Sequence, residues 1–231
     1  MNKTPSQIKH QIKTQVSGMI LAGGSSSRMQ AIATDKAWLN WQGKPIIQHI
    51  IERFQPQVNA LSINVNASPE AYQALGLPLW QDQSEPDWEK FPGPLAGILT
   101  GLRMCQKTSL ASQIPQTPWL AVAPCDAPLL PIDMVEKLYQ QATHTGAKIA
   151  IASTMDTEDK IKDHPVFSLI HTSMLESLYA YLQSGNRKIM LWMKQHSFER
   201  VVFEDARPFI INVNTPEMFN QLSQIDNTMT N

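Results

Sequence analysis

A glycine-rich segment followed by basic residues carries the clearest chemical signal in this sequence. The stretch from Met19 to Lys36 reads MILAGGSSSRMQAIATDK, in which an apolar run leads into Gly23 and Gly24. Glycine lacks a Cβ atom, so this turn can aim backbone N–H groups at a ligand. Anionic phosphate suits such donors, and Arg28 and Lys36 would add positive charge. The stretch matches neither the Walker loop nor G-x-G-x-x-G. A glycine-rich turn between a strand and a helix explains it equally well.

A second candidate is a carboxylate that follows an apolar run. Residues 119–123 read WLAVA and predict a buried strand, and PCDAP follows directly, with Asp126 at its centre. Mg²⁺ takes one or two protein carboxylates and completes its shell with water and substrate phosphate, so Asp126 is a suitable ligand. The alternative is that Asp126 caps the following helix. Asp133 fits that capping position better, which favours Asp126 as the metal ligand.

Three further polar residues are expected close to the glycine-rich turn. Residues 58–66 alternate apolar and polar side chains and predict a strand with Asn64 and Asn66 at its end. A short strand at 77–80 runs into Asp82. Asparagine is common in turns, so each residue alone has a structural explanation. Ligands of parallel α/β sheets bind beyond the carboxyl ends of the strands, however, and all three are predicted at that edge.

The order of the predicted elements indicates the α/β class, with a mostly parallel central sheet and helices on both faces. We expect one domain over residues 17–224, preceded by a flexible leader at 1–16 and followed by a disordered tail at 225–231. Further strands are predicted at 18–22, 148–153, 166–170, 201–203 and 209–213. Helices are predicted at 45–54, 69–75, 95–104, 134–143, 174–183 and 189–195.

Composition narrows the class of protein. The chain has 231 residues, a formal net charge of −1 and 17% charged residues, so a general nucleic-acid binder is not expected. Its two cysteines, Cys105 and Cys125, form no C-x-x-C pair, which disfavours a zinc site or a disulfide framework and favours the reducing cytoplasm. No apolar run approaches the length of a membrane span, so no membrane association is expected.

Several motifs occur together in one order. LAGGSSSRM is followed by DKAWL, QGKPIIQHI, FPGPLAG, PCDAP, HPVF and NVNTPE. In this combination the chain, from Gly18 to Leu222, closely resembles the molybdenum cofactor guanylyltransferase family. The first motif is shared by many nucleotidyltransferases, whereas GPLAG, PCD-x-P, HP and N-x-NTPE are narrower. The family usually has glycine at the position of Gln30, and the interval from Met29 to Asp35 is slightly longer here.

The resemblance implies a Rossmann-like nucleotidyltransferase fold and an enzyme that transfers GMP from GTP to the terminal phosphate of molybdopterin, releasing pyrophosphate with Mg²⁺ as cofactor. The expected partners are GTP and molybdopterin or the molybdenum cofactor, with molybdenum-insertion and cofactor-delivery proteins as candidates. Matched to the family, the nucleotide-binding residues would be Leu21, Ala22, Gly23, Lys36, Asn64, Asp82 and Asp126. Asp126 would also hold the metal. Lys36, Asp126 and Arg28 would be the catalytic residues.

Other functions remain open at this point. A molybdopterin cytidylyltransferase would share the glycine-rich loop and Asp126 but take CTP, and a sugar-phosphate nucleotidyltransferase is a more distant possibility. A non-catalytic nucleotide-binding or partner-docking subunit belongs to a different class. GPLAG and NVNTPE favour the guanylyl reaction over the first two. The presence of both Lys36 and Asp126 argues against a non-catalytic protein.

Overall fold

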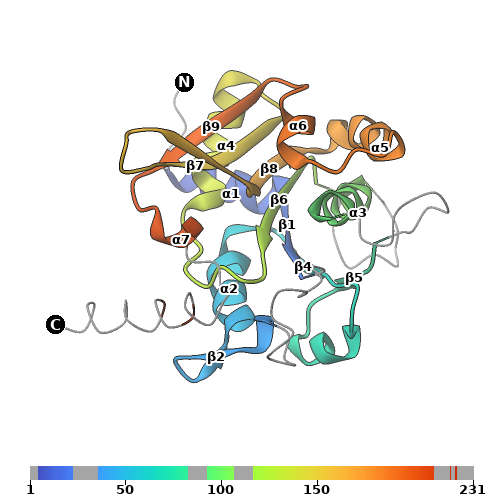
Figure 1. The fold of residues 1–231 in the computed structure, drawn as a ribbon, viewed down its shortest axis with the longest axis vertical. Helices are drawn as coiled ribbons and strands as arrows, with labels where there is room; N and C mark the ends of the chain where they lie inside the picture. The colour runs from blue at the N-terminus through green and yellow to red at the C-terminus, as the bar shows by residue number, and fades with distance from the viewer. Residues whose placement is uncertain are drawn as a thin grey trace.

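The computed structural model describes residues 5–22, 36–82, 93–106 and 117–210, together with Phe219 and Leu222. Its centre is a seven-stranded sheet with the order β5-β4-β1-β6-β8-β7-β9 (Figure 1). All neighbouring strands are parallel except β8, which is antiparallel to β6 and β7. The predicted mostly parallel α/β sheet is therefore confirmed. The strands are β1 (Val16–Leu21), β4 (Leu61–Asn64), β5 (Leu79–Trp80), β6 (Trp119–Pro124), β7 (Ile149–Met155), β8 (Ile161–His171) and β9 (Phe198–Phe203).

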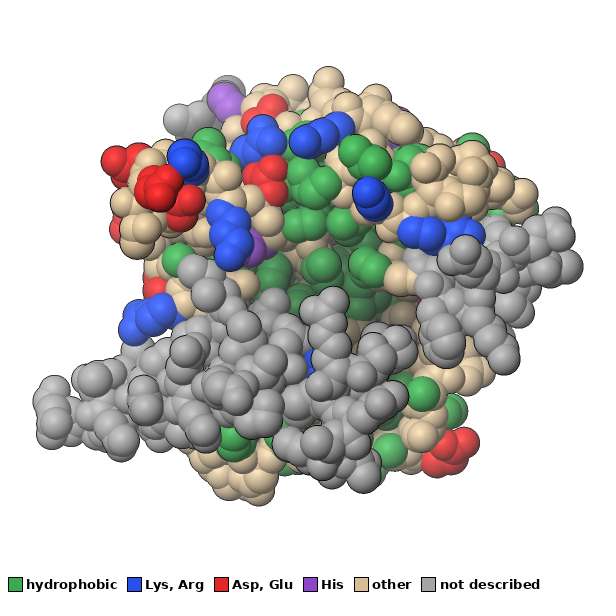
Figure 2. Space-filling model, in the orientation of Figure 1, with side chains coloured by type: hydrophobic (Ala, Val, Ile, Leu, Met, Phe, Trp, Pro, Cys, Tyr) green, Lys and Arg blue, Asp and Glu red, His purple; other side chains and the backbone are tan. Residues whose placement is uncertain are grey.

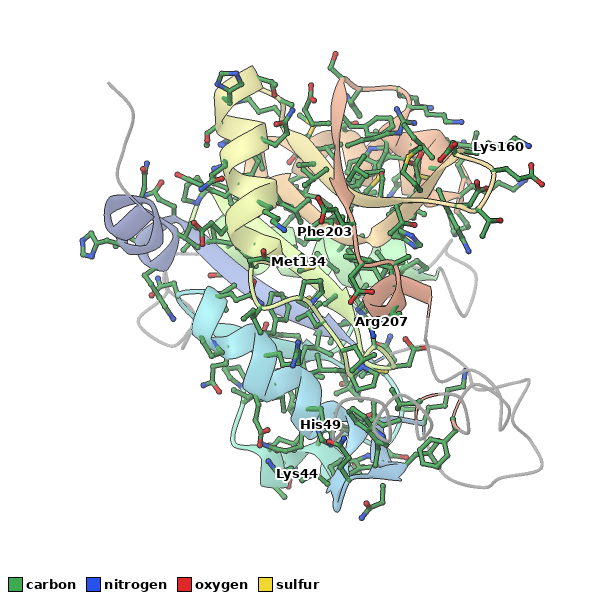
Figure 3. The ribbon with its side chains drawn as sticks, turned by 90° about the vertical axis from the view of Figure 1, so that its left-hand side faces the viewer. Lys44, His49, Met134, Lys160, Phe203 and Arg207 are labelled. Carbon is green, nitrogen blue, oxygen red and sulfur yellow. The ribbon has the colours of Figure 1, made fainter. Side chains whose placement is uncertain are left out.

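Helices cover both faces of this sheet because its central strands are apolar on both sides. In β1, Met19 packs into one core cluster and its neighbour Ile20 into the other, as the two-residue period of a strand requires. One face carries α1 (Pro5–Gln15), α2 (Ile46–Phe54), α4 (Met134–Thr145) and α7 (Arg207–Ile210). The other carries α3 (Pro94–Gln106), α5 (Leu175–Gln183) and α6 (Ile189–Met193). Figure 3 shows α2 and α4 on the first face, with Met134 at the end of α4 nearer to α2.

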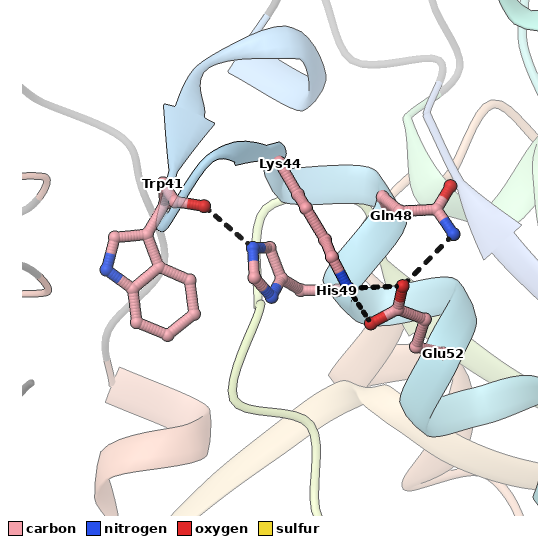
Figure 4. Close-up of polar contacts among 5 residues, drawn as sticks. All are labelled: Trp41, Lys44, Gln48, His49 and Glu52. Carbon is pink, nitrogen blue, oxygen red and sulfur yellow. Dashed lines mark hydrogen bonds and ion pairs between the residues drawn. The ribbon is translucent and has the colours of Figure 1, made fainter. Parts of the chain in front are cut away.

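A small hairpin precedes α2. Strands β2 (Asn40–Trp41) and β3 (Lys44–Pro45) are antiparallel, and both residues between them have positive φ. Two such residues are what a tight two-residue hairpin turn requires. Contacts from α2 fix the hairpin: His49 Nε2 lies 2.8 Å from the Trp41 carbonyl oxygen, and Lys44 forms an ion pair with Glu52 at 2.8 Å (Figure 4). His49 is thus a packing residue, and its ring also lies against that of Trp41.

Short 3₁₀ helices connect several of these elements. They are η1 (Lys36–Trp38), η2 (Gln55–Gln57), η3 (Pro69–Leu75) and η4 (Thr172–Met174). Within β8, the pairing with β7 shifts between Ile151 and Ala152, opposite the segment that contains Pro165. Proline has no N–H to donate to a ladder, so an irregularity at this point is expected. None of the helices among the described residues is both long and apolar enough to cross a membrane.

Two local predictions are wrong. The leader 1–16 was expected to fray, yet residues 5–15 form α1. Ile12 is 4% exposed in a core cluster, and Lys13 Nζ donates to the Val58 carbonyl at 2.9 Å. Burial of Ile12 and long-range hydrogen bonds from Lys13 thus help to anchor a polar segment.

The strand predicted at 209–213 is the second error, because Arg207–Ile210 is helix α7. The Asp205 carboxylate accepts the N–H of Arg207 at 3.0 Å, which satisfies a donor of the first helical turn. Phe209 is 2% exposed and stacks on His164. The remaining residues of the predicted strand, 211–213, and the NVNTPE motif that begins within it lie outside the described residues.

Candidate active site

The carboxyl ends of four neighbouring parallel strands lie in one row. The register pairs Leu21 of β1 with Asn64 of β4 and with Pro124 of β6, and it pairs Asn64 with Trp80 of β5. Backbone hydrogen bonds continue to the last residues of the strands, with Ala22 N–H donating to the Asn64 carbonyl at 2.8 Å. The chain therefore leaves all four strands at the same edge of the sheet, where α/β proteins bind ligands.

Asn64, Asn66 and Asp82 meet at this edge, as the sequence predicted. Asn64 Nδ2 donates to Asp82 Oδ1 at 2.8 Å, and Asn66 Nδ2 donates to Asp82 Oδ2 at 2.8 Å. The N–H of Asp82 in turn donates to Asn66 Oδ1 at 2.8 Å. We call these three residues the Asp82 cluster.

The environment of Asp82 is balanced between burial and hydrogen bonding. Burial raises the pKa of Asp82 above its usual value, and the hydrogen bonds from Asn64 and Asn66 act against that shift. The side chain of Asn64 is fully engaged as a donor, because Nδ2 also donates to the Trp80 carbonyl at 3.3 Å. Asn64 is 2% exposed. The cluster therefore joins the ends of β4 and β5 through hydrogen bonds.

Helix α3 lies against this row of strand ends at very short range. A Cβ atom on Gly97 would lie 2.5 Å from Asn64 Oδ1 and 2.7 Å from Leu21 Cδ2. One turn later, a Cβ on Gly101 would lie 2.6 Å from Leu120 Cδ2. Both positions therefore require glycine for close packing.

Asp126 lies at the same edge, two residues after β6. The residue is partly buried, and its Oδ1 atom is shielded from solvent. Cys125 N–H donates to the Leu21 carbonyl at 3.1 Å, which fixes the backbone beside Asp126 to the end of β1. The structure thus brings Asp126 to the edge that carries the Asp82 cluster. This position agrees with the prediction that Asp126 directly follows a buried strand.

The loop that carries Asp126 is anchored to α2 and η2. Arg53 Nε donates to the Leu130 carbonyl at 2.6 Å, and Gln57 Nε2 donates to the Pro131 carbonyl at 2.8 Å. Gln57 Oε1 also accepts the N–H of Val135 at 3.0 Å, in the first turn of α4. No local pattern marks Arg53 or Gln57, because their partners are backbone atoms more than 70 residues away.

Asp133 occupies the N-cap position of α4, as predicted, but its side chain makes no capping hydrogen bond. Its carboxylate instead forms an ion pair with Lys137 at 2.8 Å, four residues along the helix. Gln57 satisfies the helix N–H that a capping side chain would have met. Asp133 and Asp126 therefore differ in position and in partners, which makes Asp133 a useful comparison.

Lys36 is the first residue of η1, and its neighbours are well anchored. Ala37 is fully buried, and the ring of Trp38 meets Tyr72 edge-on with 5.3 Å between centroids. The backbone at Lys36 is thereby held between α2 and η3. Gly23 and Arg28, which the sequence also singled out, lie outside the described residues, as does the rest of the 23–35 loop.

The described residues contain no group of three or more His, Cys, Asp or Glu side chains that could hold a metal ion. Burial raises the pKa of Cys105 to about 11, so its thiol stays protonated at neutral pH and is no candidate nucleophile. A single carboxylate such as Asp126 suits a cation that takes most of its ligands from water and substrate, as Mg²⁺ does.

The side of the molecule that Figure 2 shows has a hollow near its centre. Hydrophobic side chains gather in it, and Lys and Arg side chains lie along its margin. A surface of this kind suits an organic molecule that carries negative charge.

Comparison with known proteins identifies the family. The model of the MobA-like NTP transferase domain matches residues 18–201. A molybdenum cofactor guanylyltransferase of Cupriavidus taiwanensis is 43% identical over 203 residues, covering 88% of this chain and 94% of that protein. One from Bordetella petrii is 43% identical over 197 residues, covering 85% of this chain and 92% of that protein.

Solved structures agree on the fold. A molybdopterin-guanine dinucleotide biosynthesis protein A from Archaeoglobus fulgidus superposes with a TM-score of 0.68 at 18% identity, covering 92% of this chain and 99% of that one. A CMP:2-keto-3-deoxy-manno-octonic acid synthetase gives a TM-score of 0.65 at 12% identity, covering 94% and 99%. With a family model that matches residues 18–201 and relatives 43% identical over most of its length, the chain belongs to the molybdenum cofactor guanylyltransferase family.

Proposed function

We propose that this protein transfers the GMP part of GTP to the terminal phosphate of molybdopterin and forms molybdopterin guanine dinucleotide. An oxygen of the molybdopterin phosphate bonds to the α-phosphorus of GTP, and the bond from that phosphorus to the bridging oxygen breaks and releases pyrophosphate. The observation that carries this proposal is the arrival of Asp126 and the Asp82 cluster at one edge of the sheet, in a chain 43% identical to curated guanylyltransferases over 203 residues.

The proposed roles of the residues follow from the negative charge of the two reacting groups. Both reacting groups are anions, so the protein must align them and offset their charge. Lys36 and Arg28 would stabilise the charge that develops on the α-phosphate and on the departing pyrophosphate. The backbone of Leu21, Ala22 and Gly23 would line the nucleotide site. The attacking phosphate is already ionised, so no side-chain base is needed.

The cofactor is proposed to be Mg²⁺, with Asp126 as its protein ligand. One buried carboxylate oxygen at a strand end fits a cation that is otherwise coordinated by phosphate and water. When bound, such a cation supplies positive charge to the triphosphate. We place the guanine site beside the Asp82 cluster and the molybdopterin site over the basic-rimmed hollow of Figure 2. The reaction would take place in the cytoplasm, with cofactor-delivery proteins as candidate partners.

Base selectivity is the first prediction. Guanine offers N1–H and the 2-amino group as donors and O6 as an acceptor, whereas cytosine has a smaller and different edge. A site matched to guanine leaves buried groups unpaired when another base enters, at a cost of about 1–3 kcal/mol each. We therefore expect a preference for GTP over CTP and ATP of roughly a hundredfold. A competition assay with equal concentrations of GTP and CTP measures this preference. Comparable transfer from CTP would favour a cytidylyltransferase instead.

Activity itself separates an enzyme from a non-catalytic subunit. Purified protein incubated with molybdopterin, Mg²⁺ and GTP should release pyrophosphate and form the dinucleotide. GTP binding without pyrophosphate release would indicate a nucleotide-binding subunit and contradict the proposal.

Two glycine variants test whether the close packing of α3 against Asn64 affects the binding of GTP. Gly97→Ala should force Asn64 to move, because the new Cβ would lie 2.5 Å from its Oδ1. Gly101→Ala is the matched control, since it crowds Leu120 and Met19 instead. Overpacking of either kind costs about 1–3 kcal/mol of stability. Thermal unfolding should show a loss of stability in both variants, but only Gly97→Ala should raise the KM for GTP. An equal effect of both variants on KM would mean that Asn64 has no special role.

A further inference from the structure

Exposed apolar side chains gather on one part of the central sheet. Among the described residues, five large hydrophobic side chains are exposed, and three of these, Met155, Ile161 and Val202, lie on the neighbouring strands β7, β8 and β9. Their exposed fractions are 42%, 54% and 47%. Single exposed apolar residues are normal on a protein surface, whereas a contiguous group marks an interaction site.

The strand register places these three side chains on the same face of the sheet. Met155 and Ile161 are direct cross-strand partners. Val202 is the partner of Ser153, which precedes Met155 by two residues and therefore points to the same side. Ile151, two residues earlier again, packs into the core cluster of α3, α5 and α6. The exposed face is thus the one that these helices cover near the start of β7.

One ion pair lies on the same face, between the apolar side chains. Asp163 is the strand partner of Ser153, and it receives two hydrogen bonds from the Arg200 guanidinium, at 2.8 and 2.9 Å. Arg200 precedes Val202 by two residues, and its guanidinium lies over the ring of Phe198 at 4.6 Å. A partner can cover such a pair without leaving a charge unpaired. We call Met155, Ile161, Asp163, Arg200 and Val202 the β7–β9 patch.

The two ends of the β7–β9 patch carry opposite charge. Beyond Met155 and Ile161, the turn of the β7–β8 hairpin contains three acidic side chains and one lysine, namely Asp156, Glu158, Asp159 and Lys160. Figure 3 shows Lys160 at the free end of this hairpin, where it pairs with Glu158, so the turn keeps a net negative charge. At the other end, the chain enters β9 from α6, which is flanked by the exposed residues Lys188 and Lys194.

We propose that the β7–β9 patch binds a second copy of this chain and forms a symmetric dimer. A two-fold axis across the strands brings the apolar side chains of the two copies together. It also sets the acidic hairpin turn of each copy against the lysines beside α6 of the other. A two-fold interface uses the same surface on both copies, so a patch that is acidic at one end and basic at the other is complementary to itself. This inference concerns a surface outside the nucleotide site and does not rest on the proposed function.

The experiment measures the association of the full chain by sedimentation velocity. The apolar centre is small, so we expect a reversible dimer with a Kd on the order of 10 μM, and the protein is studied from about 1 to 200 μM. Ile161→Lys places a charge in the centre of the patch. Ile132→Lys is the matched control, because Ile132 is 72% exposed and lies outside the patch, between β6 and α4. Thermal unfolding checks that both variants are folded, and Val202→Lys replaces Ile161→Lys if the latter is not.

We expect the wild type and Ile132→Lys to dimerise alike and Ile161→Lys to raise the Kd at least tenfold. Lys194→Glu should also weaken the dimer, because it sets an acidic residue against the acidic turn of the other copy, and its effect should shrink in about 1 M salt. A wild type that stays monomeric over the whole range would overturn the inference, whatever other protein binds the patch. A dimer that Ile161→Lys leaves intact, or that Ile132→Lys weakens equally, would overturn it as well. Wild-type association in Lys194→Glu would contradict the proposed orientation of the two copies.

Discussion

Asp126→Ala should give a folded protein whose turnover is reduced by about a thousandfold. A cation bound by this carboxylate contributes several kcal/mol of charge stabilisation in the transition state, and about 4 kcal/mol corresponds to three orders of magnitude in rate. The fold should persist, because Arg53 and Gln57 anchor the loop through the carbonyl groups of Leu130 and Pro131. Transfer from GTP at saturating Mg²⁺, together with thermal unfolding, measures both effects.

Asp133→Ala is the control for this variant. Asp133 is an aspartate seven residues further along the chain, and it is paired with Lys137 on the surface of α4. Exposed pairs of this kind contribute about 0–1 kcal/mol, so both stability and turnover should change little. If Asp126→Ala kept a turnover close to that of Asp133→Ala, Asp126 would not be the metal ligand.

The strand ends were predictable from the sequence because each is marked by two independent patterns. An apolar run predicts a buried strand, and the polar residue after it marks the end, as with Asn64 and with Asp126. In a parallel sheet, these ends meet at one edge whatever the strand order. The convergence of Asn64, Asn66 and Asp82 therefore followed from local patterns, and the structure confirms it.

Residues that act through long-range contacts were not predictable. Arg53 reaches the carbonyl of a residue 77 positions away, and Gln57 reaches the carbonyl of one 74 positions away. Helix α1 was missed for a similar reason, since the contacts that hold it, such as the burial of Ile12 and the Lys13 hydrogen bond to Val58, are with distant parts of the chain. The N-terminal pattern is polar, and tertiary packing decides the outcome there.

The second large effect is expected at Lys36. Lys36→Ala should lower kcat by about a hundredfold or more and change the KM for GTP much less, since a cation that meets charge developing on the α-phosphate and the pyrophosphate acts mainly on the transition state. Ala37 and Trp38 hold the backbone of η1 in place, so the variant should remain folded. Lys36→Arg would keep the charge but not the geometry, and it should recover only part of the rate.

Lys44→Ala is the matched control, because Lys44 belongs to the neighbouring hairpin and its ammonium is paired with Glu52 on the surface (Figure 4). Its kcat and KM should stay near those of the wild type. A raised KM with unchanged kcat in Lys36→Ala would mean that this lysine binds substrate and transition state equally. Wild-type kinetics in both lysine variants would mean that the loop after β1 carries Lys36 outside the site, and the charge would then have to come from Arg28. The same assay applied to Arg28→Ala distinguishes that arrangement from one in which both residues contribute.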